Sequence, residues 1–304
     1  MTDSLPRVLF LLSLLSSVPA PAVAPSDLGK LQAARNVGLA ALEESNLAEA
    51  GKRFDEVRRL APSEPLGWAD GAVTALRTKD VAGARKLLAE AQRLAPADAR
   101  IAALAGTAAE LSGETDAAIA AFEKASEGDA KDLASRWSVA RLLSEKPGGR
   151  PRAIRSVRSA LEQAPANLFL LLRLSELERS EGNRAGAQEA LERVVKEAEG
   201  ATAGDGKLER YAEEAKIALQ SGDMASAALK ARIVENLLRT TARYQQARRD
   251  VEPGVVGLPV EEWTPALALR MRARPAPIPV RFAPRAEEGL AALSGLSAVR
   301  AAGK

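Results

Sequence analysis

A period of 34 residues runs through the sequence and restricts the chain to a repeat architecture. Pro62 and Pro96 lie 34 residues apart. A fixed period of about 20 to 50 residues is typical of stacked supersecondary units, each of which buries its apolar face against its neighbours. The sequence places one extra residue in the turn-like stretch 126–136. The alanine column that carries the period is Ala50, Ala84, Ala118, Ala153 and Ala187.

Each repeat contains two helical runs separated by a short break. Glycine at a break can adopt a positive φ at the end of the first helix, and proline stops the second helix before the next unit begins. The sequence therefore predicts helical hairpins. The breaks are Lys79-Asp80, Gly113-Glu114, Gly148-Gly149, Gly182-Asn183 and Gly222-Asp223.

The repeat resembles the tetratricopeptide repeat family, and we interpret it as the exported bacterial type. One unit carries the family pattern in Trp68, Ala72, Ala84, Leu88, Ala91 and Pro96, and the next carries it in Gly106, Ala118, Phe122 and Ala125. The resemblance implies an all-α, right-handed α-solenoid. We expect a linker at 23–30, five repeats over 31–200, and a degenerate sixth hairpin and cap over 207–250, with one long second helix from about Met224 to Arg249.

Small and large residues alternate in the repeat columns for a packing reason. Alanine and glycine let helices approach closely, while bulky side chains fill the space between hairpins. On this basis we expect four aromatic residues in the core and not in a ligand cage: Phe54, Trp68, Phe122 and Trp137.

The resemblance also implies where a partner binds. In such solenoids the first helix of each unit lines a concave groove that holds an extended peptide or a partner helix. The groove positions carried over from the family to this sequence are Gln32, Arg35, Leu39, Leu66, Ala69, Val73, Arg77, Arg100, Thr107, Glu110, Phe169 and Arg179.

Composition narrows the functional classes. The sequence has no Cys and no His, which removes thiolate and imidazole nucleophiles and the usual zinc ligands. Lys plus Arg number 43 against 40 for Asp plus Glu, for a net charge of +3, so there is no strong field for nucleic acid. We expect no enzymatic activity, no cofactor, no metal and no nucleic-acid partner.

The amino terminus reads as a secretory signal. Arg7 is followed by the apolar run Val8 to Leu15 and then by small residues and prolines, as in the apolar and cleavage regions of a signal peptide. We expect residues 1–22 to be removed after Ala22, giving a periplasmic or secreted protein. The acidic Asp3 leaves two alternatives open: an uncleaved membrane anchor, which is the only membrane association we expect, and a disordered cytoplasmic tail.

The segment 251–304 is rich in proline and predicts an irregular, extended tail without long helices. Two interpretations remain open. The tail is either a disordered or loosely packed extension, or Ile278–Phe282 is the lead-in strand of a propeller-like domain that follows on a longer protein.

These features together predict a non-enzymatic scaffold that binds a protein or peptide in its groove. The alternative is an accessory N-terminal module of a larger secreted or envelope protein whose following propeller-like domain is absent from this chain.

Overall fold

The computed structural model describes residues 23–199 and 206–272. The predicted signal peptide, 1–22, and the final residues 273–304, with the expected strand at 278–282, lie outside the described residues. Regular structure in the described part is helical throughout, and none of these helices is long and apolar enough to cross a membrane. The chain divides into two compact units, one ending at Thr264 and one beginning at Pro265.

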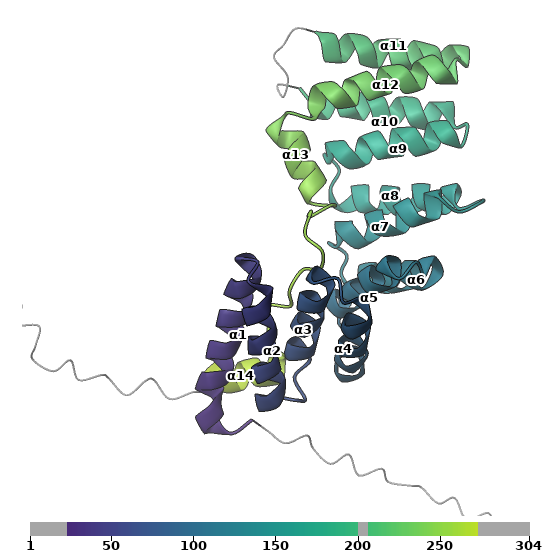
Figure 1. Cartoon of the computed structure of the whole chain (residues 1–304). Helices are drawn as coiled ribbons and strands as arrows, with labels where there is room; N and C mark the ends of the chain where they lie inside the picture. Colours follow the sequence, from purple (N-terminus) through teal and green to yellow (C-terminus); the bar gives the residue numbers. More distant parts are fainter. Residues whose placement is uncertain (1–22, 200–205, 273–304) are drawn as a thin grey trace, which may run out of the picture. The chain divides into compact units, whose positions relative to one another are not determined.

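Helical hairpins follow one another through the first unit, which confirms the predicted all-α fold class (Figure 1). The second helix of each hairpin packs against the first helix of the next. The hairpins are α1 (Leu28–Glu43) with α2 (Leu47–Leu60), α3 (Pro65–Arg77) with α4 (Val81–Leu94), α5 (Ala99–Leu111) with α6 (Thr115–Gly128), α7 (Leu133–Ser144) with α8 (Arg150–Gln163), α9 (Leu168–Ser180) with α10 (Arg184–Glu197), and α11 (Lys207–Ser221) with α12 (Met224–Leu238).

The start of the first hairpin differs from the sequence prediction. A short 3-10 turn, Pro25–Asp27, leads directly into α1 at Leu28, inside the stretch 23–30 that was expected to be a linker. Leu28 is buried, so apolar packing extends the helix by about one turn beyond the repeat pattern.

The turns within hairpins have the predicted chemistry. Gly113, Gly148, Gly182 and Gly222 all have positive φ, between 70° and 84°, where a side chain would be strained. Four of the second helices, α2, α4, α10 and α12, then begin at an Asn or Asp N-cap; for example, the Asp80 side chain accepts a hydrogen bond from the backbone N–H of Gly83 at 2.9 Å. The break positions are therefore confirmed.

Close helix packing explains the small-residue columns. All five alanines of the repeat column are fully buried. Gly106 lies against Phe122, whose ring atoms come within 2.7 Å of the position that a Cβ would occupy. Phe54 and Phe122 are core residues, as predicted, but Trp68 and Trp137 are only partly buried.

The two tryptophans differ because they do not occupy equivalent positions of the repeat. Helices α5 and α7 begin 34 residues apart, at Ala99 and Leu133, whereas α6 and α8 begin 35 apart. The insertion therefore lies in the loop 145–149, and its predicted place at 126–136 is wrong. Trp68 is the fourth residue of α3 but Trp137 is the fifth of α7, so Trp137 is rotated by about 100° around its helix.

The long helix expected from Met224 to Arg249 is also wrong. Helix α12 ends at Leu238, and a separate helix, α13 (Ala242–Arg249), begins after Thr241. The Thr241 hydroxyl caps α13 by accepting from Tyr244 N–H at 3.3 Å. Helix α13 turns back onto α9, where Asn167 Nδ2 donates to Ala247 O at 2.9 Å.

Residues 251–264, which we call the strap, continue from α13 without helical structure. Figure 1 shows this stretch running from α13 past α7 toward α3 and α1. Val251 and Val260 are each 2% exposed. This part of the predicted tail is therefore packed, and a disordered or loosely attached extension is wrong for 251–264. The described part of the second unit is one short helix, α14 (Pro265–Arg272).

Candidate functional site

The strap lies on the first helices of the first three repeats, where the resemblance places the groove. We call this surface of α1, α3 and α5 the strap-bound face. Five of the predicted groove residues contact the strap there through a hydrogen bond, an ion pair or close packing: Gln32, Arg35, Val73, Arg77 and Arg100.

Main-chain atoms of the strap are held by side chains of the helices. Arg77 donates from Nε to Val256 O at 3.3 Å and from Nη2 to Gly257 O at 3.2 Å. Its remaining nitrogen, Nη1, donates to Leu42 O at 2.9 Å, which fixes the guanidinium between two hairpins. Arg35 donates to a third strap carbonyl, that of Glu261. These side chains bond to main-chain atoms of the strap, so the contacts do not require particular side chains in the bound segment.

Asp70 supplies the complementary acceptor. Its Oδ1 accepts the backbone N–H of Val260 at 2.7 Å. The side chain is fully buried, and burial raises the pKa of this carboxyl well above its ordinary range, against the opposing effects of the Val260 hydrogen bond and of Arg35 and Arg100. Glu261 raises it further. The loss of hydration therefore outweighs the attraction of the two guanidinium groups.

Apolar side chains of the helices lie under the centre of the strap. A Cβ built on Gly257 would lie 3.3 Å from Leu104 Cδ2, 3.5 Å from Leu76 Cδ1 and 3.6 Å from Val73 Cγ1. The φ of Gly257 is +70°, a conformation that disfavours any residue with a Cβ. Glycine is therefore favoured here by the backbone conformation and, to a smaller extent, by the close approach to Leu104.

The end of the strap is fixed by an aromatic residue and a carboxylate. Trp263 Nε1 donates to Gln32 Oε1 at 2.9 Å, and the Arg35 guanidinium lies 5.9 Å from the Trp263 ring centroid. Thr264 donates to Glu64 from its backbone N–H at 2.9 Å and from its hydroxyl at 2.8 Å. Burial raises the pKa of Glu64, and the Thr264 hydrogen bonds oppose that shift.

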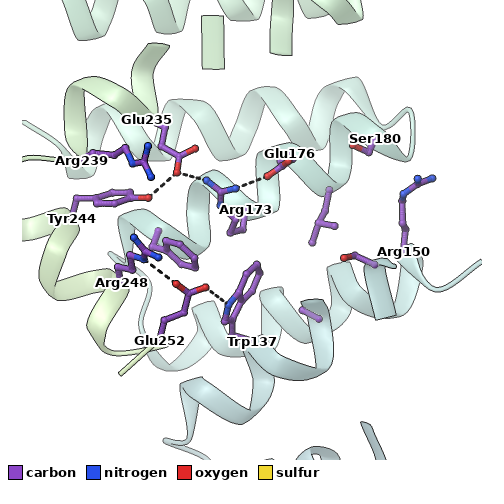
Figure 2. Close-up of a pocket in the computed structure, with 14 residues that line it drawn as sticks. Trp137, Arg150, Arg173, Glu176, Ser180, Glu235, Arg239, Tyr244, Arg248 and Glu252 are labelled. Carbon is purple, nitrogen blue, oxygen red and sulfur yellow. Dashed lines mark hydrogen bonds and ion pairs between the residues drawn. The ribbon is translucent and has the colours of Figure 1, made fainter. Parts of the chain in front are cut away.

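A pocket of about 420 Å³ continues the site beyond the strap-bound face, between α7, α9, α12 and α13 (Figure 2). Its apolar wall is aromatic: Trp137 packs edge-on against Phe169 with centroids 5.2 Å apart, and Phe169 packs against Tyr244 at 6.2 Å. Trp137 Nε1 donates to Glu252 of the strap at 3.0 Å. The one-residue rotation of Trp137 therefore brings it into this pocket.

Charges at the pocket are partly paired. Arg173 forms ion pairs with Glu176 at 2.7 Å and with Glu235. Glu235 also accepts from the Tyr244 hydroxyl at 2.8 Å, and burial together with this carboxylate raises the pKa of Tyr244 to about 12. The guanidinium groups of Arg150 and Arg239, also in the pocket lining, have no ion-pair partner among residues 23–199 and 206–272.

The remaining predicted groove residues are distributed less uniformly. Leu66 and Ala69 are fully buried in α3, and Leu39 is partly buried. Phe169 lines the aromatic pocket, and Arg179 lines a smaller one with Arg232 and Glu235. Thr107 bonds to Ala103 O within its own helix, and Glu110 pairs with Arg141 at 2.5 Å. These two residues do not contact the strap in any described interaction.

Sequence reasoning missed Asp70 and Glu64. Asp70 is the single charged residue between Pro65 and Leu76, and a lone carboxylate in an apolar helix is a signal for a buried partner. Nothing local indicates that the partner is the backbone of Val260, because that residue lies 190 positions away.

The fold and site together define a helical-repeat protein that binds one of its own segments. Solved structures similar to this chain include the pilF protein of Pseudomonas aeruginosa, at 14% identity over 74% of this chain and 99% of that chain, with a TM-score of 0.52. The MamA protein matches at 14% identity over 57% and 93%, with a TM-score of 0.50.

A third similar structure is that of YrrB, described as a TPR protein with an unusual peptide-binding site, at 16% identity over 58% of this chain and 95% of that chain, with a TM-score of 0.47. No family model and no curated protein matches the sequence. The fold is an α-solenoid of tetratricopeptide-like hairpins. At these identities, the likeness shows the fold alone.

Proposed function

We propose that the protein is a non-enzymatic interaction scaffold that binds a peptide, or a peptide segment of a partner protein, on the first-helix face of its repeats. One observation carries this proposal: Arg35, Asp70 and Arg77 hold a non-helical segment mainly through its backbone carbonyls and N–H groups. A surface that recognises main-chain atoms can hold peptides of different sequence.

The aromatic pocket extends this function. Its wall contains the partly exposed Trp137 beside the buried Phe169 and Tyr244, and Arg150 and Arg239, which have no described ion-pair partner, can attract an acidic group. We propose that a partner segment enters here and continues along the repeats toward the strap-bound face.

Export remains part of the proposal. Cleavage after Ala22 would give a periplasmic or secreted scaffold, and N-terminal sequencing of the mature protein would test it by finding Val23 first. The accessory-module alternative predicts that the natural reading frame continues into a propeller-like domain beyond Lys304.

The test is a selection of binding peptides from a randomised display library against the full chain, followed by affinity measurement on variants. We expect Arg239→Glu or Arg77→Glu to weaken binding of the selected peptides at least tenfold. The matched control is Arg59→Glu, an exposed arginine on α2 outside both surfaces. If the selected peptides bind all these variants equally well, the scaffold does not use this face and the proposal is wrong.

A further inference from the structure

We propose that the strap can be displaced from the strap-bound face. The partner is a non-helical peptide with the strap's own chemistry, which binds to this face in place of the strap. This inference rests on the proposed function and adds two properties to it: the features that the partner must present, and the competition that the chain itself provides.

The strap contacts define the partner's features by position. Gly257 sits where no Cβ fits easily, Val260 is buried and donates to Asp70, and Trp263 donates to Gln32. These three residues are spaced three apart. The partner is therefore expected to carry a small residue, then an aliphatic residue, then a tryptophan or another aromatic donor at the same spacing. An acidic residue before the aromatic is favoured, because Glu262 lies 4.0 Å from Arg100.

The strap is only partly buried, as expected for a segment that binds reversibly. Val260 is buried, but Val255, Val256 and Leu258 remain 48%, 43% and 55% exposed, so much of the strap's apolar surface gains nothing from docking.

The buried carboxylate of Asp70 destabilises the docked strap. Its Oδ2 is buried without a hydrogen-bond partner among the described residues, and a buried polar atom in this condition raises the free energy of the closed form. Release of the strap would let water reach both carboxylate oxygens. The polar contacts and the buried side chains of Val251 and Val260 thus stabilise the docked strap, and the desolvated carboxylate of Asp70 destabilises it.

The strap competes with a partner peptide because its attachment to the chain keeps it close to the strap-bound face. It is joined to α13, which is fixed on α9 through Asn167 and Ala247, so its effective concentration at the strap-bound face is high without a tight intrinsic contact. The concentration of a partner peptide with the same features must exceed this effective concentration, or the peptide must also bind the aromatic pocket.

The experiment uses a fluorescently labelled synthetic peptide with the sequence of residues 251–264, titrated against the full chain and followed by anisotropy. The Val260→Asp variant places a carboxylate at a buried apolar position whose backbone N–H bonds to buried Asp70, and this should detach the strap. We expect this variant to bind the peptide at least tenfold more tightly than the wild type. The control, Val255→Asp, makes the same change at an exposed position of the strap and should behave like the wild type.

A second pair of variants releases the strap without charge. Gly257→Val introduces a Cβ only 3.3 Å from Leu104 Cδ2, whereas Gly254→Val meets no atom within 4 Å, although both glycines have positive φ. Gly257→Val should bind the peptide more tightly than Gly254→Val. Adding Arg77→Ala to Val260→Asp should lower the gained affinity at least fivefold. Circular dichroism would establish that the helix content of each variant is unchanged.

Equal peptide affinity in the wild type, Val260→Asp and Gly257→Val would overturn the inference, and so would gained affinity that is insensitive to Arg77→Ala. If Val260→Asp loses helix content, the inference is tested by the peptide affinities of Gly257→Val and Gly254→Val, and equal affinities of these two variants would overturn it. The outcome is separable from the proposed function: display-selected peptides that bind this face, combined with no binding of the strap peptide to the released variants, would leave the scaffold standing and remove strap exchange.

Discussion

Asp70 is a buried carboxyl residue that bonds directly to the strap. Because burial raises its pKa, the folded chain binds more protons than the unfolded chain at any pH between the ordinary carboxyl pKa and the folded pKa. The contribution of Asp70 to the free energy of unfolding must then fall as pH rises through that interval, and level off above it. Glu64, whose pKa is shifted in the same direction, adds to the trend.

Asp70→Asn tests this sign. Asparagine keeps an oxygen that can accept from Val260 N–H but carries no charge. We expect the unfolding free energy of the wild type, minus that of Asp70→Asn, to decrease as pH rises from about 4, the ordinary carboxyl value. Urea unfolding of both proteins across pH 4 to about 9 measures it. A difference that is constant, or that grows with pH, would show that Asp70 is not desolvated in the folded chain.

At the scale of helices, the Gly106 contact with Phe122 sets the separation between α5 and α6. The Cβ of Gly106→Ala would fall 2.7 Å from Phe122 Cδ1, close to the base of a buried ring that has little room to move. We expect a loss of about 1–2 kcal/mol in unfolding free energy, since overpacking exceeds the gain in helix propensity.

Gly51→Ala is the matched control for that change. Gly51 also lies inside a helix, α2, but its nearest contact would be Thr74 Cγ2 at an ordinary 3.7 Å. Removing a helical glycine without a clash should stabilise the chain by about 0.5–1 kcal/mol. Thermal or urea unfolding should therefore give opposite signs for the two substitutions; the same sign would contradict the packing explanation.

Asn167 joins two elements, because its Oδ1 caps α9 by accepting from Leu170 N–H and its Nδ2 donates to Ala247 O of α13, both at 2.9 Å. Asn167→Ala removes both bonds and should cost about 2–3 kcal/mol. Asn167→Asp keeps the cap but cannot donate, so we expect it to loosen α13 while α9 stays intact. Amide exchange resolved by residue would separate the two, and equal acceleration in α9 and α13 for Asn167→Asp would argue against this division of roles.

At the scale of the whole molecule, the sequence predicts what is periodic and misses what is distant. The 34-residue register is enough to place the hairpins, and the resemblance to the tetratricopeptide family then assigns Gln32, Arg35 and Arg77 to one face, because neighbouring repeats impose the same geometry on each. The strap contacts join α3 to residues 179 to 190 positions later. No local pattern encodes such a pairing, so a stretch broken by proline and glycine reads as a loose tail.

The pocket escaped prediction for a related reason. Predicting the direction of Trp137 requires knowing whether the extra residue lies before or after it, because a shift of one position turns a helical side chain by about 100°. The other wall, Tyr244, depends on α13 turning back at Thr241, where the pattern of the sequence favours a continuous helix. Both features follow from tertiary packing, which overrides local propensity.

Both proposals require the strap to be docked on α1, α3 and α5 in solution. Residue-resolved amide hydrogen exchange of the full chain tests this most directly, because only specific strap amides donate described hydrogen bonds. Val260 and Thr264 should exchange at least a hundredfold more slowly than the free 251–264 peptide, while Val255 and Leu258 should exchange at nearly the free rate. Exchange of Val260 and Thr264 at the free-peptide rate would show an undocked strap and contradict the account.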